Sequence, residues 1–200
     1  MMKYVLSACL GYLIGSLSMS IILTKYIYKD DVRNHGSGNA GATNVARTFG
    51  WGPGFLTLLC DFAKCALSLL LGRRLCGETG FMVAGIACLI GHCYPLYFDF
   101  RGGKAVATGI CVAFLTDWRF GLTALVVFVL VAAATKYVSL ASVSGALSTI
   151  IALFFFDITP EKKVLLLFTV CQILFMHRSN LKRLCQGTET KFSAGKRKKE

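Results

Sequence analysis

Seven blocks of apolar residues divide this chain, and they constrain its fold more than any other feature. The apolar residues run together instead of repeating every 2 or 3.6 positions, and most blocks are about long enough to cross a bilayer. Only 16% of the 200 residues are charged, whereas about a quarter are charged in a soluble domain. We therefore predict an all-α integral membrane protein with one transmembrane domain over residues 1–200. The blocks are 4–24, 51–72, 79–98, 104–116, 119–135, 139–157 and 162–176.

The first block has one feature of a secretory signal peptide, because Lys3 precedes it. The block is longer than the apolar part of a signal peptide, and polar loop residues follow it instead of a secreted domain. We expect a retained first helix and seven transmembrane helices in total.

The net charge of +12 allows two interpretations, nucleic-acid binding or membrane topology. If the blocks cross alternately, fifteen of the 22 Lys and Arg residues lie on one side and six on the other, with Lys64 inside a block. Basic residues collect on the cytoplasmic side of membrane proteins. This predicts a cytoplasmic C-terminus and an external N-terminus without any nucleic-acid partner. The basic tail, residues 190–200, is then expected to bind anionic membrane lipids.

Nine cysteines raise the question of disulfides or metal binding. Their number is odd, no CxxC pair occurs, and most lie in apolar blocks, where a free cysteine behaves as a small buried hydrophobe. We expect them to pack in the interior.

A polar segment, residues 35–47, follows the first block and is expected to be a loop at the membrane surface. Its glycines let a ligand approach the backbone, so that N–H groups can face an anion. Arg47 adds a fixed charge that can bind phosphate with two hydrogen bonds. This first motif predicts a phosphorylated substrate. Its candidate residues are Ser37, Asn39, Thr43, Asn44 and Arg47.

A second motif, residues 102–108, opens the fourth block with Gly102, Gly103 and Lys104. We expect the two glycines to expose N–H groups at a helix start, where the helix dipole favours an anion. The GxxxxGK[ST] pattern is absent, which excludes a nucleotide-binding P-loop. A plain interfacial turn is the alternative, and His92, upstream, is expected to be a core or interfacial histidine.

A third motif, residues 177–189, follows the last block. His177 and Asn180 are three residues apart, so a continuing helix would place both on one face. An imidazole beside phosphates can act as acid, base or donor. An amphipathic helix after the membrane is the alternative.

Two further polar features lie outside these motifs. Ser142 near the start of the sixth block either caps that helix or donates to an anion. Asp61 and Lys64 lie on one helical face within the second block, where a structural ion pair is favoured over direct chemistry. Because all three motifs and Ser142 fall on the predicted cytoplasmic side, they indicate one anion pocket. Its few carboxylates argue against a divalent metal.

The three motifs resemble those of the bacterial acyl-phosphate:glycerol-3-phosphate acyltransferases, and the resemblance covers nearly the whole chain. Three residues depart from the usual family pattern. Cys65 and Ala105 stand where the family usually has Gly, and Leu181 stands where it usually has Ile. The matching residues are Gly36 to Asn39, Thr43, Asn44, Arg47, Gly102 to Lys104, Val106 to Thr108, His177, Asn180, Gly187 and Glu189.

The resemblance implies seven transmembrane helices in the bacterial inner membrane, with cytoplasmic motifs. It also implies transfer of an acyl chain from acyl phosphate to the sn-1 hydroxyl of glycerol 3-phosphate, giving lysophosphatidic acid and phosphate without a metal or cofactor. An enzyme that makes acyl phosphate is the expected functional partner. We assign catalytic roles to Ser37, Arg47, His177 and Asn180. Substrate binding is assigned to Asn39, Thr43, Asn44, Gly102, Gly103, Lys104 and Ser142.

The residues favour direct transfer, because no Ser-His-Asp arrangement or activated cysteine is evident. Whether His177 or a substrate phosphate accepts the hydroxyl proton stays open. Two other classes are weighed: a transporter of phosphorylated solutes and an adaptor that acts through the tail. The chain shows no inverted repeat and no matching polar cluster on the outer side, which argues against the transporter.

Overall fold

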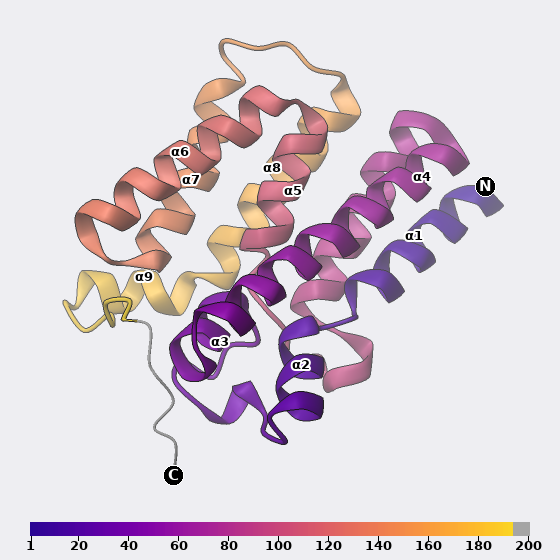
Figure 1. Cartoon of the computed structure of the whole chain (residues 1–200). Coiled ribbons are helices and arrows are strands. Elements are labelled where there is room, and N and C mark those ends of the chain that lie inside the picture. Colours follow the sequence, from indigo (N-terminus) through magenta and orange to yellow (C-terminus); the bar gives the residue numbers. More distant parts are fainter. Residues whose placement is uncertain (194–200) are drawn as a thin grey trace.

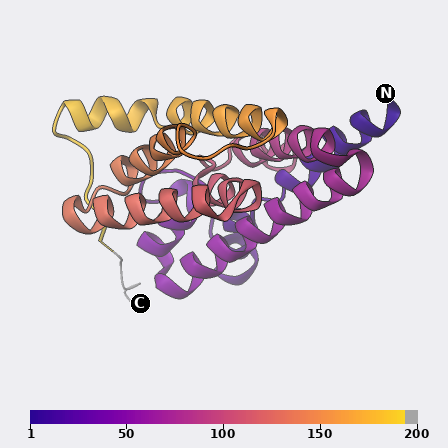
Figure 2. The ribbon, with the colours of Figure 1, turned by 90° about the horizontal axis from the view of Figure 1, so that it is seen from above.

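The computed structural model describes residues 1–193, which are helical with no strand. Figures 1 and 2 place the N-terminus and the last helix, α9 (Arg178–Cys185), at opposite ends of the molecule. Two short helices, α2 (Met19–Ile27) and α3 (Ala42–Phe49), also lie away from the N-terminus. The described polar motifs therefore gather at one end. The last seven residues, which hold the basic cluster of the tail, lie outside the described range.

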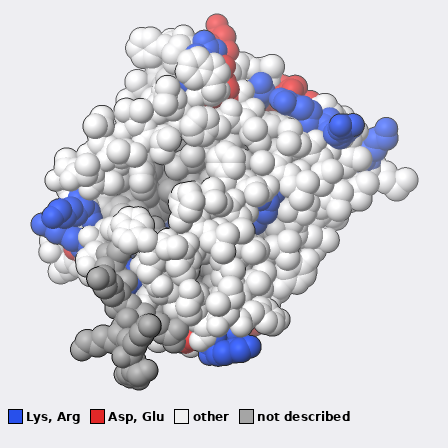
Figure 3. Space-filling view, in the orientation of Figure 1, with Lys and Arg blue, Asp and Glu red and all other residues white. Residues whose placement is uncertain are grey.

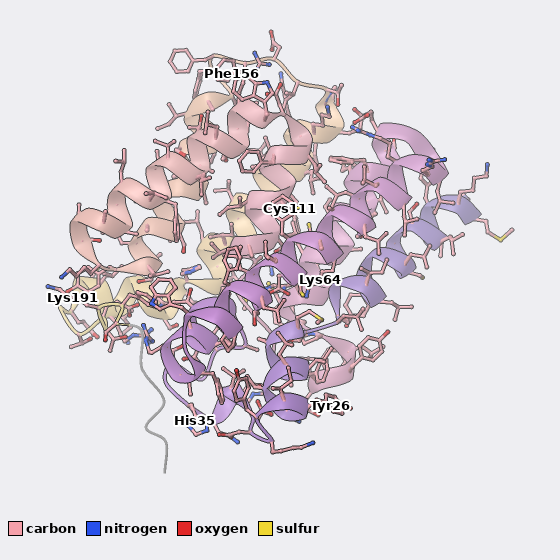
Figure 4. The ribbon with its side chains drawn as sticks, in the orientation of Figure 1. Tyr26, His35, Lys64, Cys111, Phe156 and Lys191 are labelled. Atoms are coloured by element: carbon pink, nitrogen blue, oxygen red, sulfur yellow. The ribbon has the colours of Figure 1, made fainter. Side chains whose placement is uncertain are left out.

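The first apolar block forms two helices, α1 (Met2–Gly15) and α2, in place of the one expected. At the break, the carbonyl groups of Gly15 and Leu17 accept hydrogen bonds from Lys64 Nζ at 3.0 and 2.7 Å. Lys64 Nζ also lies 2.9 Å from Asp61 Oδ1. Figure 4 shows Lys64 in the interior, where it connects α4 to the break in the first block.

The second and third blocks form the two arms of α4 (Trp51–Cys93), which is interrupted at Cys76 and Gly77. Gly77 has a φ of +61°, a conformation that glycine adopts without strain. The arms then pack closely, since a Cβ on Gly72 would lie 2.3 Å from the carbonyl oxygen of Gly80. The second arm ends five residues earlier than predicted, because Pro95 and the short turn η2 (Leu96–Phe98) follow it.

Four helices complete the membrane part: α5 (Val106–Thr116), α6 (Trp118–Thr135), α7 (Val138–Ala152) and α8 (Pro160–Met176). A short turn, η1 (Val32–Asn34), precedes the first motif. The prediction of a loop throughout that motif was wrong, because α3 occupies its second half. Val45, Ala46 and Phe49 are buried on one face of α3, which makes it an amphipathic surface helix.

By length and composition, three segments within residues 1–193 are apolar enough to cross a membrane: Met2–Ile27, Trp51–Phe98 and Trp118–Thr135. The bent pair α8 and α9 makes a fourth, and α5 and α7 are shorter. The count of seven spans stays a prediction. Figure 3 shows charged side chains mostly at the two ends, with a nearly uncharged surface between them, as a bilayer requires.

The main core lies between α4, α5, α7 and α8, and includes Leu69, Phe81 and Leu165, all fully buried. Four cysteines pack within it: Cys65, Cys88, Cys93 and Cys111. All nine cysteines lie in the described range and are free. Interior packing of cysteine is therefore confirmed for these four, and the prediction was wrong for Cys9, Cys171 and Cys185, which are exposed.

Candidate active site

A cavity of about 370 Å³ opens where the three motifs meet. It brings together residues that are up to 153 positions apart in the sequence, from Ser37 to Thr190. Nine of the predicted site residues line it: Ser37, Asn39, Thr43, Asn44, Arg47, Lys104, Ser142, His177 and Asn180. Gly102 and Gly103 do not.

Asn44 holds the first motif in shape. Its Nδ2 donates to the carbonyl oxygens of Val32, His35 and Asn39 at 2.9 to 3.1 Å, and its Oδ1 accepts from the backbone N–H of Ser37 at 3.0 Å. The side chain is 1% exposed, so its hydrogen-bonding capacity is committed to the loop. The structure therefore gives Asn44 a scaffold role in the loop, while its predicted contact with substrate stays a prediction.

Arg47 is the free cation of this site. It lies in the last turn of α3, half-buried, and lines the cavity. Within residues 1–193 its guanidinium forms no hydrogen bond or ion pair, whereas Arg33, in the same loop region, is paired with Asp31. Arg47 can therefore offer its full donor set to a ligand.

The glycines of the second motif act differently from the prediction. The N–H groups of Gly102 and Gly103 donate to the carbonyl oxygens of Cys93 and His92 at 3.1 and 3.0 Å. They cap the end of α4 and are not free for an anion. Glycine is needed because a Cβ at Gly102 would lie 2.1 Å from the His92 carbonyl oxygen, and one at Gly103 would lie 2.2 Å from His92 Nε2. The predicted amide cradle at these positions was wrong.

Lys104 projects from this loop into a hydrogen-bonded network with the third motif. Its Nζ donates to Asn180 Oδ1, and Asn180 Nδ2 donates to Glu189 Oε1 at 2.7 Å. Glu189 also accepts from Ser139 and Arg183, each at 2.7 Å. Glu189 thus fixes the Asn180 amide so that its oxygen faces Lys104. This agrees with the structural role expected for Glu189.

The pKa values of two groups in this network, Lys104 and Glu189, are shifted from their ordinary values. Burial lowers the pKa of Lys104, and the neighbouring charge of Arg183 lowers it further. Burial alone would raise the pKa of Glu189, but hydrogen bonds from Asn180, Ser139 and Arg183 outweigh it, so the net shift is downward. Glu189 is therefore a carboxylate at neutral pH.

His177 occupies the break between α8 and α9, which are bent by 55°. The chain bends here and continues as a separate helix, and His177 and Asn180 both line the cavity. His177 Nδ1 lies 2.8 Å from the Ile173 carbonyl oxygen, so Nδ1 carries the proton that this bond needs. In the neutral ring, Nε2 is then left as a hydrogen-bond acceptor.

The serines on α7 also differ from expectation. The helix begins at Val138, so Ser142 is not its cap. Ser142 Oγ donates to the Val138 carbonyl oxygen at 2.8 Å and keeps its lone pairs for the cavity. Sequence reasoning missed Ser139 and Arg183, which also line the cavity. Their only signal was proximity to Ser142 and Asn180 in the chain.

The other part of the cavity wall is apolar and lies between α4, α5 and α6. It is lined by Leu58, Phe62, Ile110, Phe114, Leu125 and Phe128. The cavity therefore has a cationic polar end and an apolar end, which suits an amphiphilic ligand. Among residues 1–193 no group of three or more His, Cys, Asp or Glu side chains could hold a metal ion.

A family model described as glycerol-3-phosphate acyltransferase matches residues 5–187 of the chain. The chain belongs to this family. A glycerol-3-phosphate acyltransferase of Thermoanaerobacter pseudethanolicus is 43% identical over 190 residues, covering 95% of this chain and 96% of the relative. Glycerol-3-phosphate acyltransferase 2 of Bacillus anthracis is 39% identical, covering 94% and 98%.

Two crystal structures of PlsY, an integral membrane glycerol 3-phosphate acyltransferase, share the fold. The glycerol 3-phosphate form matches with a TM-score of 0.89 and 32% identity, covering 95% of this chain and 96% of that one. The lysophosphatidic acid form matches with a TM-score of 0.87 and 31% identity, covering 95% of each. This member of the glycerol-3-phosphate acyltransferase family is thus a multi-pass integral membrane protein like PlsY.

Proposed function

We propose that the protein transfers a fatty acyl chain from acyl phosphate to the sn-1 hydroxyl of glycerol 3-phosphate. The products are lysophosphatidic acid and inorganic phosphate. The observation that carries the proposal is a single cavity that joins a cationic end, at Arg47 and Lys104, to an apolar end between α4, α5 and α6. Such a cavity accommodates a phosphate and an acyl chain together, and it belongs to a chain of this family.

The cations offset the repulsion between the two substrates, which both carry phosphate. Two unit charges 4 Å apart interact by about 4 kcal/mol at an effective dielectric constant of 20. Lys104 is held in place by Asn180, and Arg47, which has no protein partner in the described chain, keeps its donors for a phosphate. Ser37 and Ser142 supply hydroxyl groups beside them. Positioning and charge neutralisation then account for catalysis on an activated donor.

The reaction proceeds by direct attack in this proposal. The sn-1 oxygen forms a bond to the acyl carbonyl carbon, the acyl–oxygen bond to phosphate breaks, and inorganic phosphate leaves with the bonding electron pair. His177 Nε2, unprotonated in the neutral ring, accepts a hydrogen bond from the attacking hydroxyl and orients it. The hydroxyl proton passes to this nitrogen or to a substrate phosphate oxygen.

Membrane placement follows the same proposal. Seven spans would put the polar end of the cavity on the cytoplasmic side of the bacterial inner membrane, with the N-terminus outside. Glycerol 3-phosphate then enters from water, while acyl phosphate enters from the lipid past the apolar wall. The acyl phosphate would come from a separate enzyme that makes it.

Purified protein in lipidic mesophase tests the reaction. It is mixed with radiolabelled glycerol 3-phosphate and either palmitoyl phosphate or palmitoyl-CoA. We expect labelled lysophosphatidic acid, with stoichiometric release of phosphate, from palmitoyl phosphate alone. Product from the CoA ester alone would overturn the proposed donor. No product from either donor, in protein shown to be folded, would overturn the enzyme itself and call for an assay of glycerol 3-phosphate transport.

A further inference from the structure

Two buried polar residues, Asp61 and His92, line the same cavity but belong to none of the three motifs. They are 2% and 4% exposed. Within the described chain, His92 Nδ1 has no hydrogen-bond partner. Asp61 Oδ1 contacts Lys64 Nζ at 2.9 Å but accepts no hydrogen bond, because that ionic contact lacks the required geometry. Buried polar atoms without hydrogen bonds are costly, so this pair calls for a ligand.

The separation of the two atoms defines what the ligand must offer. Asp61 Oδ1 and His92 Nδ1 lie 3.7 Å apart, which is too far for a direct hydrogen bond. An oxygen placed between them at about 2.8 Å from each has ordinary hydrogen-bond lengths to both. With the proton of the neutral imidazole on His92 Nδ1, this oxygen accepts from His92 and donates to the carboxylate, and a hydroxyl group does both. A phosphate does not fit, because the Asp61 carboxylate repels it.

The pair adjoins the phosphate-binding end of the cavity. The His92 ring packs against Gly103, since a Cβ on that residue would lie 2.2 Å from His92 Nε2. The His92 carbonyl oxygen accepts from the Gly103 N–H at 3.0 Å. Lys104 is the next residue, and it lines the same cavity as Arg47, Asp61 and His92. A small phosphorylated alcohol in this cavity can therefore face both the cations and the Asp61–His92 pair.

We propose that Asp61 and His92 form a hydroxyl subsite that binds the C2 hydroxyl of the glycerol backbone. This rests on the proposed function and adds the feature that makes glycerol 3-phosphate, and not any small phosphorylated alcohol, the preferred acceptor. The reacting C1 hydroxyl is a poorer occupant, because it must lie beside acyl phosphate, an anion that the Asp61 carboxylate repels. Since C2 is the stereocentre, the subsite also distinguishes the two mirror-image glycerol phosphates.

An acceptor that lacks one oxygen tests the subsite. Glycerol 3-phosphate is compared with 3-hydroxypropyl phosphate, which keeps the phosphate and the reacting hydroxyl but has no C2 hydroxyl. In the wild-type protein we expect kcat/KM to favour glycerol 3-phosphate by at least about tenfold, because the analogue leaves His92 Nδ1 without a partner and Asp61 Oδ1 with only its ionic contact to Lys64. Equal use of both acceptors would mean that the pair holds only a water molecule and would overturn the proposal.

Two variants separate hydroxyl binding from a structural role. In His92→Phe and in Asp61→Asn, kcat/KM for glycerol 3-phosphate should fall while the analogue is affected less, so that the preference drops towards one. An unchanged preference with lower activity on both acceptors would mean that the pair only supports the fold, and would overturn the subsite. Thr57→Val, on the same arm of α4 but outside the cavity, is the matched control and should keep the wild-type preference.

The outcomes also separate the subsite from the proposed reaction. A wild-type protein that makes no lysophosphatidic acid from acyl phosphate would refute the reaction. A wild-type protein that makes acylated product equally from glycerol 3-phosphate and from the analogue would refute only the subsite. If neither variant folds, equal use of both acceptors by the wild-type protein still overturns the subsite.

Discussion

At the residue scale, Ala105 has an uncommon backbone for a non-glycine residue. It is fully buried with φ +60° and ψ +24°, directly after Lys104. This left-handed conformation costs an alanine about 1–2 kcal/mol, while a buried methyl group contributes about 0.8 kcal/mol. We expect Ala105→Gly to raise the free energy of unfolding by up to about 1 kcal/mol. Ala105→Val should lower it by about 2 kcal/mol or more, because a β-branched side chain is strained there.

Thermal unfolding in detergent measures both changes. A clear loss of stability in Ala105→Gly would mean that packing of the methyl group outweighs the backbone strain.

Arg47 is expected to be the most sensitive cation of the site. Arg47→Ala should lower kcat/KM by about a hundredfold or more, since the guanidinium acts on developing charge in a water-poor cavity. Insertion and thermal stability should not change, because the side chain has no partner within residues 1–193. Arg101→Ala, at an exposed arginine beside the second motif, is the matched control. Near-normal activity in Arg47→Ala would refute the proposed phosphate contact.

Glu189 is expected to make the catalytic rate depend on pH. The pKa of Glu189 is lowered in the folded protein. Above the pKa of an ordinary carboxyl group, Glu189 is therefore fully ionised and supports Asn180 completely. This support is lost only as the pH falls through the lowered pKa. Glu189→Gln removes the charge but keeps the shape, and should lower kcat by about tenfold near neutral pH. A pH–rate profile checks this: the decline in kcat at acid pH that Glu189 causes should be absent in the variant. An acid limb identical to that of the wild type would exclude this role.

At the scale of elements, Lys64 connects helices that are distant in the sequence. Its amine satisfies carbonyl groups 49 and 47 residues away and pairs with Asp61. Lys64→Met leaves a buried carboxylate and two carbonyl groups without partners, so the protein should lose about 3–5 kcal/mol of stability. Adding Asp61→Asn should recover part of that loss, and Arg74→Ala on the exposed side of α4 should change little.

Thermal unfolding of the single and double variants measures the coupling. A double variant less stable than Lys64→Met would show that the carboxylate stabilises the fold by some other contact.

The same scale shows what the sequence could predict. The apolar blocks located the helices of the membrane part to within a few residues, because hydrophobic length is a local property. The blocks did not predict the break at residues 16–18, which depends on Lys64, nor the capping of α4 by Gly102 and Gly103. The blocks also did not predict α3, because its buried face is too short to form an apolar block. The motifs predicted nine residues that line the cavity, but not that Asn44 serves the loop, because its partners are set by the tertiary fold.

At the scale of the whole molecule, the distribution of charge predicts the orientation in the membrane. In the predicted seven-span topology, the basic residues assigned to the side of the polar end outnumber those assigned to the opposite side by fifteen to six. The four residues from Lys196 to Lys199 provide part of this excess, and replacing them with glutamine leaves eleven against six. We therefore expect the C-terminus to stay cytoplasmic in that variant, because the remaining bias has the same sign.

Reporter fusions in a bacterial host measure the orientation. A fluorescent protein fused to the C-terminus should fluoresce, and alkaline phosphatase fused after residue 117, in the turn between α5 and α6, should be active outside the cell. Both results should persist in the glutamine variant, whereas reversing the charges of Arg101, Lys104 and Lys136 as well should weaken the preference. An active phosphatase at the C-terminus of the wild-type protein would contradict the seven-span topology and would place the polar end of the cavity away from cytoplasmic glycerol 3-phosphate.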